Sequence, residues 1–472
     1  MKRYLALVAG LIFVLGFTAV AFAIHAEIPS DTQAVVAKGT TQITLGGEIR
    51  ARGEYREVDF NTDDHVDVNG SGIKGDARNE DGSYYDARVR LSVDAQVTPN
   101  TSGFVQVEAG NGPTADNYTW GTAENGAQGI YGVGNAKRGA FNILQAWILH
   151  KGSGLLGVPA GVKVGHMPLA LGNKLFFDHT KFGDDAIVFF VDPTKELHIG
   201  LLTAKFRERQ SALSDDANAY VGLFTYKGQG FNLSGDITYV DDQSNTQSGP
   251  RFKDLNNNGK LDPGEPFLNS DIHFWNLGLR GDMKVDPVTI RADVELQTGK
   301  IVNTVGAETK YKGYAFLIGA DFKVDPVTLT AEFAYGSGDK DNDNKIKAFV
   351  TSLSADPHFT YIYEYSTVNA CGNLYGGICN TMYVKLGASA QPVKDLTASL
   401  NLFWLRANQV PDNWKKDIGI EIDPKVTYKI DKNLTYWIEG GYLMAGDFWK
   451  RGNANAKVDD AYAVRHGIML TF

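Results

Sequence analysis

The last residues of the chain alternate in a way that few folds can accommodate. From Tyr462 to Phe472, apolar side chains recur at every second position except at His466. Successive side chains of an extended strand point to opposite faces, so this segment predicts a strand with one apolar face. That face carries Tyr462, Val464, Ile468, Leu470 and Phe472, and the opposite face carries Ala463, Arg465, Gly467, Met469 and Thr471.

This ending resembles the C-terminal strand by which bacterial outer-membrane β-barrels are recognised during assembly, which closes on an aromatic residue such as Phe472. The resemblance implies the barrel-assembly machinery as a partner, and outer-membrane lipid and lipopolysaccharide as surroundings. The alternative is the last strand of a soluble β domain.

The N-terminus has the pattern of a secretory leader. Lys2 and Arg3 form the charged start, an apolar run extends from Leu5 to Phe17, and Ala21-Phe22-Ala23 is a small-residue cleavage site. A retained anchor is disfavoured because the apolar run is shorter than the roughly 20 residues of a spanning helix. We expect a signal peptide at 1–23, with cleavage after Ala26 as the alternative, a short periplasmic segment at 24–39, and a barrel over 40–472.

Composition excludes nucleic-acid binding. The formal net charge is −9, and removing the two positive charges of Lys2 and Arg3 leaves −11, whereas nucleic-acid binding requires a basic footprint. The mean hydropathy of −0.22 is compatible with a membrane barrel, because lipid-facing and lumen-facing residues alternate. The 52 glycines and 11% aromatic residues suit turns and interfacial girdles.

The same alternation divides the chain into eighteen candidate strands, from one near Thr40 to one near Asp460. Short turns and long polar connections follow each other strictly. The turn Lys284-Val285-Asp286-Pro287-Val288-Thr289 recurs as Lys323-Val324-Asp325-Pro326-Val327-Thr328, and long connections cover 59–82, 111–138, 241–270 and 338–379. An even strand number with this layout predicts an all-β fold, a transmembrane antiparallel up-and-down β-barrel with both termini on the periplasmic side.

The segment from 288 to 297 shows which face meets lipid. Arg291, Asp293 and Glu295 share one parity, and apolar residues occupy the other. A charge facing lipid at mid-depth costs about 2–4 kcal/mol, so the charged parity lines the lumen. The segments 187–191 and 220–226 do not follow this rule, and Pro424 predicts a bulge.

On the first, second and last strands, the same rule places a series of arginines on one lumenal wall, because the last strand of a closed barrel pairs with the first. Arginine binds carboxylates bidentately and stays charged. Two roles remain open: anion selectivity, and ion pairing that braces the wall. The candidate pore-lining residues are Arg50, Arg52, Arg56, Arg88, Arg90, Arg291 and Arg465, with Glu48, Glu54, Asp86 and Asp94.

The stretch from Val162 to Asn173, continuing through Phe182-Gly183-Asp184-Asp185, resembles the strand, loop and strand of the alginate-export-type porin family. His166-Met167 stands where that family has an Arg-Gln pair. The resemblance implies an 18-stranded monomeric porin with a charged pore. The loop between Met167 and Asp184 is rich in apolar residues, and two placements are open: folded into the lumen, or packed on the barrel rim.

A twelve-residue segment fits the EF-hand calcium loop at every ligand position, with Gly259 at the sharp turn. The usual flanking helices are missing, so the resemblance is to an isolated loop of this type. Extracellular calcium modules bind weakly, so we expect weak binding with a structural role, ordering a long loop at the pore mouth. The alternative is a solvated loop rich in asparagine and glycine. The candidate ligands are Asp254, Asn256, Asn258, Lys260 through its carbonyl, Asp262 and Glu265.

The two cysteines, Cys371 and Cys379, are expected to form a disulfide, because the chain is exported. A barrel of eighteen strands leaves an aqueous channel unless loops plug it. We therefore expect an outer-membrane porin for passive diffusion of ions and small hydrophilic solutes, anions included. Alternatives are export of an anionic sugar or polysaccharide and a scaffold around a periplasmic partner. No nucleophile motif accompanies the nine histidines, so no enzyme is expected. Monomer and trimer both remain open.

Overall fold

The computed structural model describes residues 34–38, 41–57, 82–110, 118–119, 140–155, 157–208, 216–244, 270–303, 307–340, 343–353, 358–365, 370–371 and 376–472. The expected signal peptide and the expected calcium loop lie outside these residues. Within 24–39, Ala34–Lys38 forms β1, which pairs antiparallel with the start of the next strand. Among the described residues, no helix is long and apolar enough to cross a membrane.

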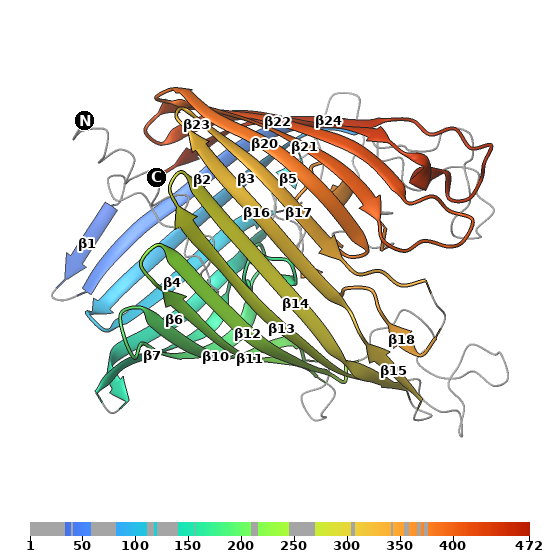
Figure 1. Cartoon of the computed structure of the whole chain (residues 1–472). Helices are drawn as coiled ribbons and strands as arrows, with labels where there is room; N and C mark the ends of the chain where they lie inside the picture. Colours follow the sequence, from blue (N-terminus) through green and yellow to red (C-terminus); the bar gives the residue numbers. More distant parts are fainter. Residues whose placement is uncertain are drawn as a thin grey trace.

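Eighteen antiparallel strands form a sheet that closes on itself (Figure 1). Closure occurs where the last strand pairs with β2, from Thr471 opposite Glu48 to Tyr462 opposite Glu57. The predicted barrel and its strand number are confirmed. The strands are β2 (Thr41–Glu57), β3 (Gly82–Thr98), β4 (Thr101–Gly110), β6 (Ala140–Leu155), β7 (Val158–Met167), β9 (Asp184–Val191), β10 (Leu197–Arg207), β11 (Ala217–Lys227), β12 (Phe231–Asp242), β13 (Ser270–Val285), β14 (Val288–Asn303), β16 (Tyr314–Val324), β17 (Val327–Gly336), β20 (Thr381–Val393), β21 (Leu396–Ala407), β22 (Asp417–Asp431), β23 (Leu434–Ala445) and β24 (Ala461–Thr471).

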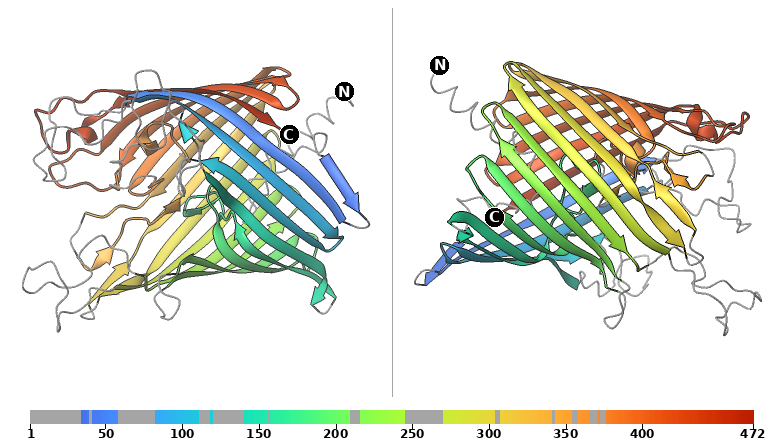
Figure 2. Two further views of the ribbon diagram at one scale, coloured as in Figure 1. Left: turned by 180° about the vertical axis from the view of Figure 1, so that it is seen from behind. Right: turned by 60° about the horizontal axis from the view of Figure 1, so that its bottom comes forward.

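Short turns gather at one end of the barrel and long connections at the other (Figure 2). The C-terminus and β1 lie at the short-turn end (Figure 1). The two repeated turns join β13 to β14 and β16 to β17, each through a cis Asp–Pro peptide. The loops that enter the lumen therefore start from the ends of a regular wall of strands.

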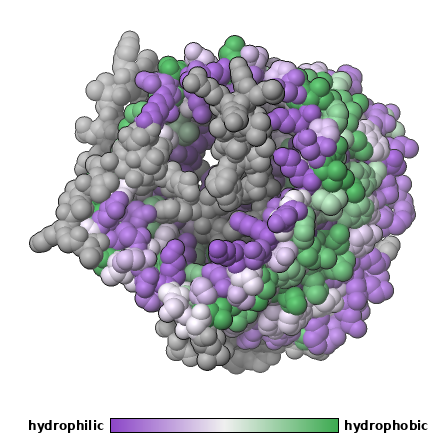
Figure 3. Space-filling view, turned by 60° about the vertical axis from the view of Figure 1, so that its left-hand side comes forward, coloured by the Kyte–Doolittle hydropathy of each residue, from purple (hydrophilic) through white to green (hydrophobic). Residues whose placement is uncertain are grey.

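The outer face of the barrel is apolar and the inner face is polar. On β14, Val294 and Leu296 are 43% and 53% exposed, whereas Asp293 and Glu295 are fully buried. Figure 3, a view toward the short-turn end, shows hydrophilic side chains around a central hollow and hydrophobic ones on the outer surface. An apolar outer belt of this kind requires lipid, so the barrel lies in the outer membrane.

The two segments that broke the alternation rule have an explanation inside the barrel. Val188 of β9 and Leu223 of β11 point inward, yet they are apolar and buried, because a loop inside the lumen packs against them. The bulge predicted at Pro424 is wrong. The register between β22 and β23 is the same before and after Pro424, and only the pairing is interrupted there.

Several short elements were not predicted. Three extend the sheet, and β8 pairs in parallel with β19 inside the barrel, apart from the wall. Strands and 3₁₀ helices of two to four residues are too short to produce a recognisable periodicity in the sequence. They are β5 (Tyr118–Thr119), β15 (Glu308–Tyr311), β18 (Lys345–Ile346), β8 (Phe177–Asp178), β19 (Ser352–Leu353), and the 3₁₀ helices η1 (Tyr363–Tyr365) and η2 (Asp447–Lys450).

Candidate functional site

One wall of the lumen, formed by β24, β2 and β3, carries six arginines, and we call it the arginine wall. The three strands pair in register, so that Arg465 lies opposite Glu54 and Arg52 lies opposite Asp86. The arginine side chains are between 10% and 19% exposed. The members of the arginine wall are Arg50, Arg52, Arg56, Arg88, Arg90 and Arg465.

Carboxylates on this wall are shared between arginines. Nε of Arg52 donates to Asp86 at 2.6 Å, and Nη2 of Arg50 lies 3.6 Å from the same carboxylate. Two arginines therefore share the carboxylate of Asp86, and Arg465 also lies 3.5 Å from Glu439 on β23. The same sharing joins Glu54 to Arg465 (2.6 Å) and to Arg56 (3.0 Å), and further pairs are Arg88 with Glu48 and Arg90 with Glu108.

A second charged cluster is buried in the wall of β12, β13 and β14. Arg280 is 3% exposed, with Nη1 2.5 Å from Asp236 and Nη2 2.6 Å from Glu295. Asp293 lies 3.5 Å from Nε of Arg280 and accepts a hydrogen bond of 3.3 Å from the backbone N–H of Asn173. The cluster therefore holds both the wall and a loop that descends onto it.

That loop, residues 168–183 between β7 and β9, is the first lumenal loop. Its Leu171, Leu175 and Phe176 are at most 5% exposed, and the ring centroid of Phe176 lies 5.7 Å from that of Phe274 on β13. Since Phe274 faces the barrel interior, the loop folds into the lumen. Of the two placements open from the sequence, the structure adopts the inward one.

We call the described residues between β17 and β20 (337–340, 343–353, 358–365, 370–371 and 376–380) the second lumenal loop. Carboxylates of β22 hold its η1 segment: Glu421 accepts from the backbone N–H groups of Ile362 (2.5 Å) and Tyr363 (3.0 Å), and Asp423 accepts from that of Tyr361 (3.2 Å). Backbone amides thus replace water as donors to carboxylates that face the lumen. The loop is thus anchored to β22, which lies two strands from β20 in the wall.

The second lumenal loop also reaches the arginine wall. The ring of Tyr361 lies 5.3 Å from the guanidinium of Arg465. Within the loop, Glu364 accepts backbone N–H groups of His358 (2.8 Å) and Thr360 (3.0 Å). Burial raises the pKa of Glu364, although these donors and the charge of His358 act in the opposite direction. The second lumenal loop therefore lies against Arg465 of the arginine wall.

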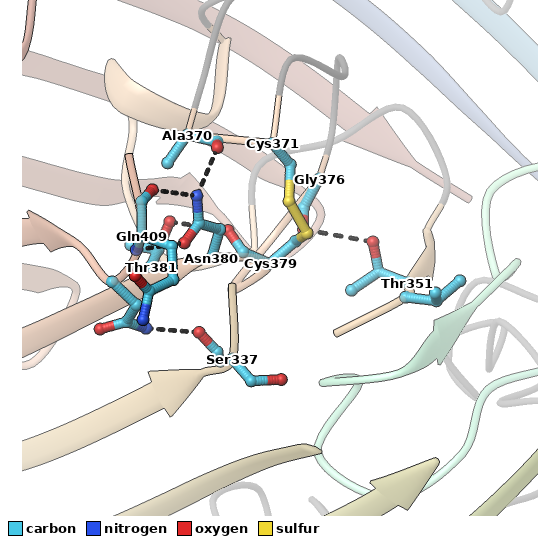
Figure 4. Close-up of a disulfide and its surroundings, with 12 residues drawn as sticks. Ser337, Thr351, Ala370, Cys371, Gly376, Cys379, Asn380, Thr381 and Gln409 are labelled. Atoms are coloured by element: carbon cyan, nitrogen blue, oxygen red, sulfur yellow. Dashed lines mark hydrogen bonds between the residues drawn. A yellow bond between two sulfur atoms is a disulfide. The ribbon is translucent and has the colours of Figure 1, made fainter. Parts of the chain in front are cut away.

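Cys371 and Cys379 form a disulfide with a Cα–Cα distance of 5.9 Å, near the point where the second lumenal loop returns to β20 (Figure 4). Next to it, Oγ1 of Thr351 donates to the carbonyl of Gly376 at 3.2 Å. The side-chain amide of Asn380 donates to the carbonyl of Gln409 at 2.8 Å. The bridge therefore closes the base of the loop beside a hydrogen-bonded junction.

A chain of hydrogen bonds ties the two lumenal loops together. Nε2 of His179 lies 2.9 Å from Oγ of Ser352, and Nδ1 lies 2.9 Å from Oδ2 of Asp184. The order is that of a Ser-His-Asp relay. However, the backbone N–H of Ser352 donates to the carbonyl of Phe176, so that amide is not available to stabilise an oxyanion.

A family model described as alginate export matches residues 41–462. The chain belongs to the alginate export family. The match spans the whole barrel up to the beginning of β24, as the resemblance of the 162–185 stretch implied. A barrel of this family in the outer membrane is a transport channel, and the chain is a porin-type protein with a polar lumen.

Several solved structures are similar to this chain. Among them are the anion-selective porin from Comamonas acidovorans (11% identity, TM-score 0.42, 92% of this chain and 100% of that one), OccK11 from Pseudomonas aeruginosa (11%, 0.48, 91% and 96%), and Salmonella typhi OmpF in complex with daunomycin (14%, 0.42, 93% and 100%). A search of curated proteins gave no significant match.

The residues proposed from the sequence have different outcomes. Those of the arginine wall share one face of the barrel and pair with Glu48, Glu54, Asp86 and Glu108, and Asp94 lies further along β3, opposite Thr44. Arg291 lies on another wall, paired with Asp321 and Glu332 at 2.6 Å each. The candidate calcium ligands Asp254, Asn256, Asn258, Lys260, Asp262 and Glu265 lie outside the described residues.

Sequence reasoning missed Arg280 and Asp236, although the signal was present. Both lie on the inward parity of their strands, as Arg291 does on β14. What the alternation does not reveal is that three carboxylates converge on Arg280, because convergence depends on the register of three strands.

Proposed function

We propose that the barrel is a passive diffusion channel for ions and small hydrophilic solutes, with a preference for anions. The observation that carries the proposal is the sharing of Asp86 and Glu54, each between two arginines. Guanidinium groups have five N–H donors and remain charged, so the wall presents a field that attracts anions along a water-filled lumen.

The test is single-channel recording in a planar bilayer, with the reversal potential measured across a salt gradient. Wild type is expected to select anions. The double variant Arg50→Gln/Arg465→Gln removes two positive charges while Asp86 and Glu54 each keep another arginine, so the wall should still fold. Its reversal potential should shift toward cations.

The matched control is Arg50→Lys/Arg465→Lys, which keeps the charge and should keep the anion preference. Arg291→Gln tests a charge on a different wall and should shift the reversal potential less. Cation selectivity in the wild type would overturn the proposal and leave the arginines as braces.

Export of an anionic polysaccharide is the second candidate, because the family is described as alginate export and the arginine wall has the complementary charge. Oligouronates added on the short-turn side should then interrupt the ion current of the wild type and have less effect on Arg50→Gln/Arg465→Gln. No interruption at any voltage would favour small solutes alone.

Catalysis is not part of the proposal. The Ser352–His179–Asp184 chain supports a tie between the loops, since the amide of Ser352 is already engaged. Ser352→Ala should therefore weaken the contact between the two lumenal loops and have no effect on ester hydrolysis. As a separate proposal, the C-terminal strand β24 is the contact with the barrel-assembly machinery.

A further inference from the structure

A cavity of about 250 Å³ lies inside the barrel, between the first lumenal loop and the wall of β10 to β13. The wall contributes inward-facing residues such as Phe206, Val240 and Phe274, and the loop contributes Leu171 and Phe177. Its other boundary is the 350–352 segment of the second lumenal loop. The cavity is therefore lined by lumenal elements rather than by lipid-facing ones, and it is partly open to the lumen.

The lining is apolar, in contrast to charged parts of the lumen such as the arginine wall. On the same strands, a few residues toward the short-turn end, the wall carries Asp236 and Arg280. Phe206, Val240 and Ile272 pack against the buried core but remain partly exposed, although the loop already covers much of this wall. Apolar area left open to water in this way costs about 25 cal/mol per Å², and an apolar ligand would recover it.

From this lining we propose that the cavity binds a small neutral apolar compound, of the size of a substituted benzene ring. An apolar cavity of about 150 Å³ accommodates benzene, so this one has room for the ring and a short substituent. The inference deepens the proposed channel function, because it names a class of solute that the lumen retains.

The rim of the cavity determines which polar group the ligand carries. Among the described lining residues, Asp242 is the one with a charge, and its Oδ1 accepts from the backbone N–H (2.8 Å) and the hydroxyl (2.6 Å) of Ser244, which leaves Oδ2 for a ligand. Hydroxyl groups of the lining belong to Thr238, Tyr311, Thr351 and Ser352. A carboxylate at the rim repels an anionic head group and accepts a hydrogen bond from a hydroxyl. The site is therefore suited to an aromatic alcohol and disfavours an aromatic acid, in contrast to the arginine wall.

The test measures binding directly, without reference to ion current. Fluorine NMR line broadening of 4-fluorobenzyl alcohol is recorded with the full-length protein in lipid nanodiscs, and competition with unlabelled benzyl alcohol separates specific binding from partition into lipid. Wild type should show broadening that the competitor reverses. Val240→Trp fills the cavity from its partly exposed wall and should abolish the competable part.

Met469→Trp is the matched control, because it places the same side chain on the inward parity of β24, on the opposite side of the barrel. It should bind as the wild type does. Asp242→Asn tests the rim: benzoate should compete poorly in the wild type and several-fold better in this variant.

Equal competable broadening in the wild type and in Val240→Trp, or none in the wild type, would overturn the inference. Conductance of the same preparations separates this failure from failure of the channel proposal. If the protein binds the alcohol but does not conduct, the channel proposal is refuted and the binding site is supported. If it conducts but shows no competable binding, the binding site is refuted and the channel proposal stands.

Discussion

Nε2 of His358 lies 2.9 Å from Oδ2 of Asp178, and this contact joins the second lumenal loop to the first. Both side chains are buried, at 7% and 6% exposure. Burial works against the charged carboxylate, but hydrogen bonds from His358 and Thr180 and the charge of Lys174 outweigh it and hold the pKa of Asp178 well below its ordinary value. The two loops are thus coupled through an ionised carboxylate 180 residues from its partner.

This contact predicts acid-induced gating. Because the pKa of Asp178 is depressed in the folded loop, its stabilising contribution is complete above the unfolded-state value of about 4 and is lost as the pH falls below it. Current fluctuations of single channels should therefore increase progressively as the pH falls below about 4, toward the lower pKa of the folded loop.

The variant Asp178→Asn should fluctuate at pH 6 as the wild type does at low pH, and lose the pH dependence. Asp185→Asn is the control, because Asp185 is 76% exposed and contacts His166 within the same hairpin rather than the other loop. Unchanged pH dependence in Asp178→Asn would show that another group controls the loops.

Arg280 is expected to be indispensable for barrel stability. Arg280→Met leaves Asp236, Asp293 and Glu295 buried together without a counter-charge, which should cost about 3–5 kcal/mol. The urea midpoint of unfolding in lipid vesicles measures this loss. Arg291→Met, at a position 23% exposed, should cost less, and equal midpoints for the two variants would contradict the assigned burial.

The barrel seam makes a prediction about assembly. A Cβ added at Gly47 would lie 2.7 Å from Cζ of Phe472 and 2.7 Å from the carbonyl oxygen of Arg90. Since the backbone of Gly47 also exchanges hydrogen bonds with that of Phe472, Gly47→Ala should lower the fraction of heat-modifiable, folded barrel. Gly82→Ala, where an added Cβ meets nothing within 4 Å, should assemble as the wild type does.

The segment 254–265 is predicted to bind Ca²⁺ with a dissociation constant of about 10⁻⁴–10⁻³ M. Isothermal titration should show binding that Glu265→Gln weakens, because that position supplies the bidentate ligand. Asp343→Asn is the control: Asp343 lies 3.1 Å from Nζ of Lys347 and 3.4 Å from that of Lys345. Equal Ca²⁺ affinity in Glu265→Gln and Asp343→Asn would contradict the assignment of a calcium site to residues 254–265.

Much of the wall was predictable from the sequence. Val294 and Asp293 illustrate why: lipid selects the apolar residue and the lumen selects the charged one at each successive position, so the pattern is local. The arginine wall followed from the same rule, together with closure of β24 on β2. The prediction of a bulge at Pro424 was wrong because a proline can also occupy a position where strand pairing is interrupted without a change of register.

The sequence by itself therefore determined the strands, their inward and outward faces and the charge of one wall, because membrane burial acts on every second residue independently. Tertiary structure alone decided that two loops enter the lumen, that Asp178 meets His358, and that Arg280 gathers three carboxylates. These contacts join segments far apart in the chain, and their energies exist only after the barrel has closed and brought those segments within bonding distance.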